Sequence, residues 1–259
     1  MIRTGDGRLK LSASRLKTWL SCPMKWAAVY IDERPLKTTP SMAFGTALHR
    51  ALEEEHRARW LGHQAPELLD VFAEALDRSG AEVPLAERQK MLRQASSLLD
   101  LYLEQYADEQ VLAAELELTA PVIDPVTGED LGELTGIIDL VTADGHLVDL
   151  KTSARAPSGL QAVLANAVQL DCYRYLVDSS QPDLDIRGGE IRSLIRTKVP
   201  RVETTELPLR PFDGLFDLVR RYKRAVEELE IYPRPGILCE DSCPAIEACR
   251  SHHGLEVPA

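Results

Sequence analysis

The chain has 259 residues, of which 44% are hydrophobic and 27% charged, and its formal net charge is −11. This length and composition are ordinary for a folded protein with one large domain or one core with appendages. No window approaches the roughly 18 consecutive apolar residues of a membrane span, and the first residues lack the apolar core of a signal peptide. We therefore expect no membrane segment and a cytoplasmic location.

The acidic net charge argues only weakly against a nucleic-acid partner. Local basic patches decide whether phosphates bind, and a metal site itself needs acidic side chains. Any DNA contact is then expected in a groove. One basic stretch near the edge of the predicted sheet comprises Arg192, Arg196, Lys198 and Arg201. An ordinary solvated strand face explains this stretch at least as well.

Residues 11–108 are predicted to be a helical segment. The first helix, over 11–31, has Ser12 or Ser14 as its N-cap and is interrupted at Cys22-Pro23, because proline suits the start of a helix better than its interior. Further helices are predicted over 41–61, with Ser41 at its start, over 66–77 and over 84–108.

Residues 109–210 are predicted to form a sheet core. Alternating apolar residues and turn signals predict strands over 111–123, 133–142, 146–152, 189–198 and 201–209, the last pairing with the strand before it. A helix is predicted over 159–178. Residues 211–259 add a helix over 212–230 and a tail rich in proline and cysteine. The whole chain, 1–259, is thus predicted to be a single domain of the α/β class, an α+β mixed sheet flanked by helices.

An acidic hairpin is the first candidate for chemistry. Gly136-Ile-Ile-Asp139 and Asp149-Leu-Lys151 lie on adjacent predicted strands. Side chains alternate across a strand, so Asp149 and Lys151 share a face while Leu150 points into the core. Two carboxylates there can hold a cation such as magnesium, and the lysine can stabilise charge on a phosphate. The alternative is a surface hairpin with solvated charges.

The hairpin register decides whether both carboxylates reach one metal. A two-residue loop, Asp144-Gly145, would place Asp139 opposite Leu150 and turn it away from Asp149. A three-residue loop that starts at Ala143 would instead pair Asp139 with Asp149. A shared metal site therefore predicts the three-residue loop, or a bulge with the same effect.

A histidine and a Gln–Tyr pair are possible companions of the hairpin. Gly45, His49 and Glu53 share one helical face, with His56 a further turn on, and a glycine there fits a close approach by a strand or ligand. His49 could bind the metal with Glu53 supporting it. In isolation, a packed or surface histidine is the better interpretation.

On the helix after the Asp-x-Lys strand, Gln169 and Tyr173 also share a face and could contact a phosphate or a base. Taken alone, a half-buried tyrosine with a polar neighbour is an equally good interpretation of this pair.

Four of the five cysteines form a second candidate site. Cys239, Cys243 and Cys249 lie close together in the tail, and Cys22 lies beside a proline at the predicted helix break. Four thiolates can bind zinc or an iron–sulfur cluster, which would join the two ends of the chain. Cys172 is expected to be a core thiol. Unligated cysteines are the alternative.

Together these motifs resemble the RecB-like branch of the PD-(D/E)XK nucleases, which includes CRISPR-associated single-strand nucleases with an iron–sulfur cluster and the nuclease domain of the AddB helicase subunit. The matching motifs are Leu11-Ser-Ala-Ser-Arg-Leu, Cys22-Pro23, Gly45-x3-His49, Gly136-x2-Asp139, Asp149-x-Lys151, Gln169-x3-Tyr173 and the terminal cysteines.

The resemblance implies a restriction-endonuclease-like core and a role for each matched position. The ligands of magnesium or manganese would be His49, Asp139, Asp149 and the backbone carbonyl of Leu150. The catalytic group would be Lys151, with Gln169 and Tyr173 completing the site and contacting DNA. A 4Fe–4S cluster would be bound by Cys22, Cys239, Cys243 and Cys249, with zinc the less favoured occupant. The implied activity is cleavage of DNA, single-stranded or at ends, by an exonuclease in repair, recombination or related processing.

Two positions depart from the family pattern. The tail has three residues between Cys239 and Cys243 where the family usually has two, and Asp149 stands where many relatives have Glu. The chain has no G-x-x-x-x-G-K-[ST] motif, so a helicase or other repair partner would be a separate protein. The alternatives are a structure-selective endonuclease and a non-catalytic iron–sulfur DNA-binding or scaffold protein. The oligomeric state is left open.

Overall fold

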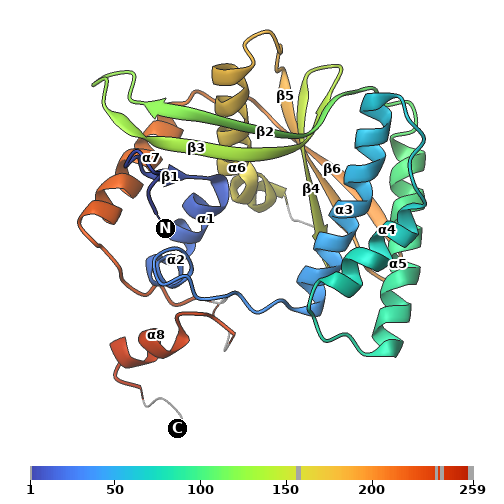
Figure 1. The fold of residues 1–259 in the computed structure, drawn as a ribbon, viewed down its shortest axis with the longest axis horizontal. Coiled ribbons are helices and arrows are strands. Elements are labelled where there is room, and N and C mark those ends of the chain that lie inside the picture. The colour runs from blue at the N-terminus through green and yellow to red at the C-terminus, as the bar shows by residue number, and fades with distance from the viewer. Residues whose placement is uncertain (1, 156–158, 237–238, 240–241, 256–259) are drawn as a thin grey trace. The chain divides into compact units, whose positions relative to one another are not determined.

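The computed structural model describes residues 2–155, 159–236, 239 and 242–255, without the side chains of 159–162 and 165 (Figure 1). Within these residues the chain forms six strands and eight helices, which confirms the predicted α/β class with a mixed sheet. Two compact units are distinguished: unit 1 comprises 1–37, 118–136 and 211–259, and unit 2 comprises 38–117 and 137–210. No helix in the described part combines the length and apolar character of a membrane span. The assignment of 1–259 as a single domain stays a prediction.

Unit 2 is built on a mixed sheet. Its strands are parts of β2 (Val111–Ile123) and β3 (Asp130–Thr142), with β4 (His146–Ser153), β5 (Gly188–Ile195) and β6 (Arg201–Leu207). β2 pairs with β3, β3 is antiparallel to β4, β4 is parallel to β5, and β5 is antiparallel to β6. The predicted strands are therefore all present, and the expected pairing of the last two is confirmed.

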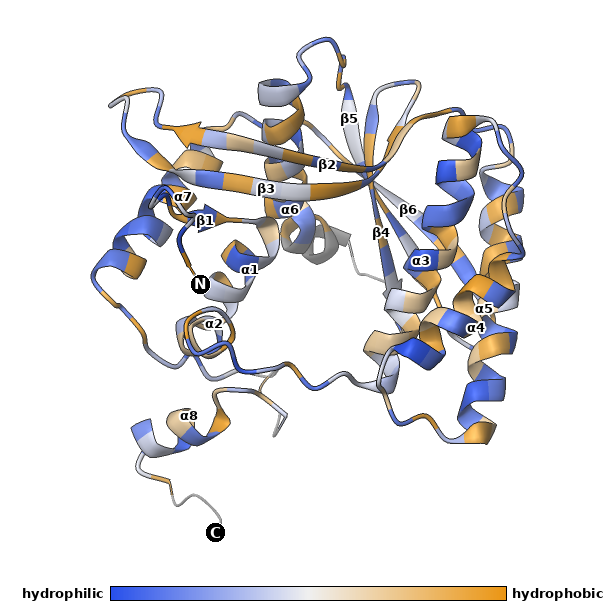
Figure 2. Cartoon of the chain, in the orientation of Figure 1, coloured by the Kyte–Doolittle hydropathy of each residue, from blue (hydrophilic) through white to orange (hydrophobic). Residues whose placement is uncertain are grey.

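Three helices cover one face of this sheet: α3 (Pro40–Leu61), α4 (Leu68–Arg78) and α5 (Leu85–Gln105). Each carries both apolar and polar residues, as the colouring in Figure 2 shows. Their apolar side chains, such as Phe44 and Leu98, form one core with Val148, Leu150 and Leu194, which point to the same side of the sheet. This core fixes α3 against β4.

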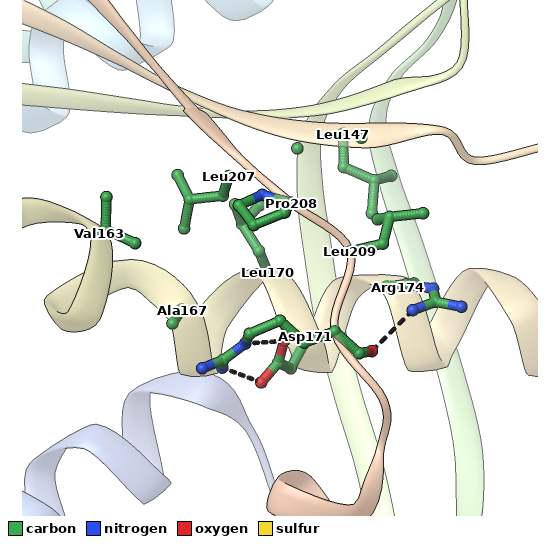
Figure 3. Close-up of a pocket in the computed structure, with 12 residues that line it drawn as sticks. Leu147, Val163, Ala167, Leu170, Asp171, Arg174, Leu207, Pro208 and Leu209 are labelled. Carbon is green, nitrogen blue, oxygen red and sulfur yellow. Dashed lines mark hydrogen bonds and ion pairs between the residues drawn. The ribbon is translucent and has the colours of Figure 1, made fainter. Parts of the chain in front are cut away.

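The fourth helix of unit 2, α6 (Gly159–Ser180), packs on the opposite face. A Cβ atom added to Gly189 would lie 2.8 Å from a methyl group of Leu170, so the glycine lets α6 approach β5 closely. A cavity of about 50 Å³ remains beside this contact, lined mainly by aliphatic side chains (Figure 3). At the cavity, Arg210 forms an ion pair with Asp171, and Arg174 donates a hydrogen bond to the Arg210 carbonyl, at 2.8 Å.

Unit 1 joins the beginning of the chain to its end. β1 (Lys10–Leu11) runs parallel to β3, and the helices are α1 (Ala13–Ser21), α2 (Pro23–Tyr30), α7 (Asp213–Glu227) and α8 (Ile246–His252). Ser12 caps α1, since its side chain accepts a hydrogen bond from the Arg15 N–H at 3.2 Å. Trp26 and Tyr222 meet edge to face with ring centroids 5.5 Å apart, which packs α2 against α7. The predicted break at Cys22-Pro23 is confirmed.

Two short elements and one cap differ from the sequence-based expectations. Strand β1 has two residues and helix α8 has seven, too few for a periodic pattern to be recognised. Helix α3 begins at Pro40, and its N-cap is Thr39 rather than Ser41. Proline at the first helical position needs no hydrogen-bond partner for a backbone N–H, which explains the earlier start.

The basic stretch on β5 and β6 is not a continuous surface. Arg192 is 1% exposed and bonds to both oxygens of Glu109, to Glu190 and to the Tyr102 hydroxyl. Its guanidinium also lies over the Tyr106 ring, 3.8 Å from the centroid. Both earlier interpretations of this arginine, as a groove residue or as a solvated one, are wrong, because charge-assisted hydrogen bonds to the partly buried Glu109 and Glu190 hold it in the core.

Candidate active site

The hairpin register brings the two aspartates opposite each other. Leu140 pairs with Val148 and Val141 with Leu147, and continuing this register by one step places Asp139 opposite Asp149. The turn is closed by a hydrogen bond of 3.0 Å from the Gly145 N–H to the Thr142 carbonyl, with φ of 87° at Gly145. This positive φ suits glycine at the end of a three-residue hairpin loop. The predicted loop from Ala143 to Gly145 is confirmed.

Two side chains of the candidate site contact the backbone of Leu150. Its N–H donates to Asp139 Oδ2 at 2.7 Å, and its carbonyl oxygen lies 2.7 Å from His49 Nε2. The N–H and C=O of one strand residue point to the same side, here toward β3. The side chains of Asp139 on β3 and His49 on α3 thus meet at the two peptide groups that flank the Leu150 side chain.

Helix α3 can bring His49 this close because of Gly45. A Cβ atom on Gly45 would lie 2.7 Å from Thr152 Oγ1 on β4. The expectation that a strand approaches this glycine closely is confirmed. The other ring nitrogen of the histidine, Nδ1, is 3.8 Å from Asp139 Oδ2. The ring therefore lies between the Asp139 carboxylate and the Leu150 carbonyl.

Asp149 is held from both sides of its carboxylate. It is 1% exposed, and its Oδ1 accepts a hydrogen bond of 2.6 Å from Gln169 Nε2. The same amide donates to the Tyr173 hydroxyl at 2.8 Å, so the two residues of α6 reach the site together. Lys151 Nζ lies 2.6 Å from Asp149 Oδ2 as an ion pair, although no hydrogen bond of good geometry reaches this oxygen within the described residues.

Negative charge is crowded at this site. Burial raises the pKa of Asp139, and the nearby Asp149 carboxylate raises it further. Burial also raises the pKa of Tyr173, with added repulsion from Asp149 and Asp139. A cation between the carboxylates would relieve this repulsion, because an opposite charge favours their ionised forms.

Glu115 on β2 is a site residue that the sequence interpretation missed. Burial raises the pKa of its carboxyl to about 7, with further contributions from Asp139 and Glu53. Its φ is 49°, which is uncommon for a residue other than glycine and often marks a functional position. Ala113 and Ala114 are neighbours in β2 and both are buried, so the regular alternation of buried and exposed side chains is interrupted just before Glu115. A bulge that turns Glu115 toward the site is consistent with this slip.

The remaining residues of the histidine helix have other partners. Glu53 forms an ion pair with Arg57 at 2.7 Å and another with Arg50, instead of directly supporting His49. His56 is buried and lies 3.0 Å from the Tyr102 hydroxyl through its Nε2. The shared helical face predicted for these residues therefore continues from the site into the core.

The donor set fits a divalent cation in kind. Two carboxylates, one backbone carbonyl and one imidazole nitrogen are ligands that magnesium and manganese accept. Asp149 Oδ2 is buried and has no hydrogen bond in the described structure, so it could bind a cation. The two other candidate ligands, His49 Nε2 and the Leu150 carbonyl oxygen, lie 2.7 Å apart. Among the described residues, however, no three His, Cys, Asp or Glu side chains are already placed as a set of metal ligands. Binding would therefore need small side-chain shifts.

The four candidate cluster cysteines all lie in unit 1, but among the described residues no three of them are placed as a set of metal ligands. Burial raises the pKa of the Cys249 thiol, and the proximity of Cys22, Cys239 and Cys243 raises it further. Cys22 is also the N-cap of α2. Its sulfur accepts N–H groups from Lys25 at 3.5 Å and from Arg234 at 3.4 Å. The fifth cysteine, Cys172, is buried on α6, as expected for a core thiol.

The tail is also tied to the first helices by backbone contacts. The Met24 N–H donates to the Tyr232 carbonyl at 3.1 Å, and the Arg34 guanidinium donates to the Pro244 carbonyl at 3.2 Å. In the tail, Tyr232 precedes the three cysteines and Pro244 lies between Cys243 and Cys249. They join the beginning and the end of the chain independently of any bound metal.

The chain is similar to known proteins in sequence pattern and in fold. A solved structure from Eubacterium rectale, described as a "putative exonuclease", has a TM-score of 0.56 and 13% identity over 96% of this chain and 90% of that one. The solved structure of SSO0001 has 15% identity over 85% of this chain and 95% of that one, but its TM-score of 0.35 supports no argument. No protein of curated function matches. Residues 10–250 match the PD-(D/E)XK nuclease superfamily, and the chain therefore belongs to that superfamily.

Proposed function

We propose that this protein is a metal-dependent deoxyribonuclease that acts as an exonuclease on single-stranded DNA or DNA ends. The observation that carries the proposal is the hairpin register, which places Asp139 opposite Asp149 with Lys151 on the same strand. Membership of the superfamily supports a nuclease that uses a divalent metal and DNA. The description of the Eubacterium rectale neighbour supports the preference for exonuclease action.

The metal would be held by His49, Asp139, Asp149 and the Leu150 carbonyl. When bound, magnesium or manganese lowers the pKa of a coordinated water and polarises the phosphate. Gln169 orients the carboxylate of Asp149 through their 2.6 Å hydrogen bond. Because Asp139 accepts the Leu150 N–H, its carboxylate is fixed relative to β4.

Other side chains act on the DNA phosphate and on protons. The Lys151 ammonium would stabilise negative charge that develops on the phosphate during in-line attack. Gln169 and Tyr173 would contact the DNA strand beside this phosphate, which the hydrogen bonds of Gln169 to Tyr173 and to Asp149 support. Glu115, with a pKa of about 7, can hold or release a proton near neutral pH.

A structure-selective endonuclease would use the same residues and is the second enzymatic candidate. A non-catalytic scaffold has no need of Asp139, Asp149 and Lys151 in one place, so their geometry disfavours it. We place the activity in DNA repair, recombination or related processing, with any helicase motor on a separate protein.

The proposal is tested by incubating the protein with end-labelled single- and double-stranded DNA and magnesium or manganese. We expect end-dependent cleavage of the single strand, none with EDTA, and little cleavage of a circular single strand. Asp139→Asn should reduce the rate by about 10²-fold or more, because it weakens metal binding. Asp144→Asn makes the same change in the exposed hairpin loop and should keep full activity. Equal activity of both variants, or unchanged activity in EDTA, would reject the site; rapid cutting of the circle would favour the endonuclease.

We also infer that Cys22, Cys239, Cys243 and Cys249 bind a 4Fe–4S cluster rather than zinc. The N–H groups directed at the sulfurs of Cys22 and Cys239 support metal-bound thiolates, because such hydrogen bonds stabilise the negative charge on sulfur, and the choice of an iron–sulfur cluster follows from the resemblance of the cysteine motif. Protein purified without oxygen should absorb broadly near about 400 nm and contain iron and sulfide. Cys22→Ala should lose the absorbance and Cys172→Ala should keep it. Bound zinc without iron would contradict the cluster.

A further inference from the structure

In this acidic chain, exposed arginines usually face a carboxylate. In unit 2, examples are Arg57 with Glu53, Arg88 with Asp77 and Arg187 with Asp185. Five cations of unit 2 differ, namely Lys90 and Arg93 on α5 and Arg155, Arg196 and Lys198 beyond the ends of β4 and β5. Among the residues that the structure describes, no carboxylate lies within ion-pair distance of them. Unpaired cations are a minority in a protein of net charge −11, so their location is informative.

Three of these five cations, Arg155, Arg196 and Lys198, lie together at one edge of the sheet, beyond Lys151. β4 and β5 are parallel, so their carboxyl ends meet: Lys151 pairs with Ser193, and Ser153 with Ile195. Arg155 follows the end of β4, and Arg196 directly follows β5. The Arg196 N–H donates to the Ser153 carbonyl at 2.9 Å, which continues the pairing to this point. We call Arg155, Arg196 and Lys198 the cationic edge.

Arg196 is held in place by contacts that do not neutralise it. Its guanidinium lies 4.9 Å from the centroid of the Phe44 ring and donates to the Ser41 hydroxyl. Both partners belong to the first part of α3, whose first turn contains no acidic residue. The N-terminal end of a helix carries partial positive charge, so it adds to the local positive potential. An ordered arginine without a carboxylate partner keeps its charge available to bind an incoming anion.

We propose that the cationic edge binds phosphates of the DNA strand whose scissile phosphate lies at Lys151. This inference rests on the proposed nuclease function and adds the path of the strand beside the site. Phosphates bind arginine and lysine without regard to base sequence. The edge continues from the same strand, β4, that carries Asp149 and Lys151, so one DNA strand can contact both.

The test is the salt dependence of DNA binding. A fluorescein-labelled single-stranded oligonucleotide is titrated in EDTA, so that it stays intact, with wild type and with Arg155→Ala/Lys198→Ala. Two lost phosphate contacts should reduce the slope of log K against log salt by about 1.4 and weaken binding on the order of tenfold at about 0.1 M salt. Both residues are exposed, and unchanged thermal unfolding of the variant verifies its fold.

The matched control is Lys90→Ala/Arg93→Ala, which removes one lysine and one arginine from exposed positions of α5. It changes net charge equally and should leave the slope unaltered. An unchanged slope in the edge variant, or an equal loss in both variants, would overturn the proposal. If wild type cleaves DNA, the nuclease function is supported whether or not the edge variant changes the salt dependence of binding. Failure of wild type both to bind and to cleave DNA would instead reject the nuclease function.

Discussion

Replacing Lys151 by alanine is expected to lower kcat by about 10²–10³-fold, the usual cost of removing one donor that stabilises transition-state charge. Its ammonium lies 2.6 Å from Asp149 Oδ2, and 35% of the side chain is exposed, so the chain's fold depends little on it. The expected loss is therefore in chemistry rather than in folding. Single-turnover cleavage of end-labelled DNA at saturating protein measures it directly, with Lys90→Ala as the control for loss of a lysine.

The metal affinity of Lys151→Ala shows whether Lys151 stabilises the transition state or instead organises the metal ligands. Lys151→Ala removes a positive charge beside Asp149, so the affinity for manganese should stay the same or rise. Titration of manganese followed by its paramagnetic resonance signal gives this affinity without DNA. If Lys151→Ala instead binds manganese much more weakly, the lysine organises the metal ligands. If kcat is unchanged and only KM rises, it binds DNA without stabilising the transition state.

The central hairpin could be derived from the sequence because local rules determine it. Strand alternation, a glycine at the loop end and the requirement for two carboxylates on one face led to the register that the structure shows between β3 and β4. The close approach of Gly45 to Thr152 followed in the same way from a glycine at a costly helical position. In both cases the informative residue is a glycine, Gly145 in the hairpin loop and Gly45 in helix α3, at a position where its backbone freedom or small size is needed.

Glu115 and Arg192 could not be placed by such rules. The orientation of Glu115 depends on a single backbone angle, φ of 49°, within an otherwise regular strand. Arg192 is bound by Glu109, which is 83 residues away in the sequence. The local sequence pattern predicts neither the backbone angle of Glu115 nor the distant partner of Arg192. An arginine on a strand beside other cations thus has the same sequence signature whether it meets solvent or a distant carboxylate.

Replacing Arg192 by alanine should destabilise the protein by about 3–5 kcal/mol, the usual effect of removing one partner of a buried ion pair. Glu109 and Glu190 would lose their shared cation, and the Tyr102 hydroxyl would lose a donor. Urea unfolding followed by circular dichroism measures the change. The control is Arg201→Ala, which breaks the ion pair of an exposed arginine with Glu203 and should cost about 1 kcal/mol or less. Similar losses in the two variants would show that Arg192 is not effectively desolvated.

The same substitution should also reach the active site. Arg192 on β5 pairs with Leu150 on β4, and the Leu150 carbonyl contacts His49. Arg192 also donates a hydrogen bond to the Tyr102 hydroxyl, which contacts His56 on α3, the helix that carries His49. Helix α3 is thus connected to the sheet at two places, through His49 and Leu150 and through His56, Tyr102 and Arg192. The substitution Arg192→Ala weakens the second connection. Folded Arg192→Ala should bind manganese more weakly than wild type. Leu76→Ala, which disturbs the buried core at α4, should lose stability without this loss of affinity. Equal affinities in all three proteins would confine the role of Arg192 to stability.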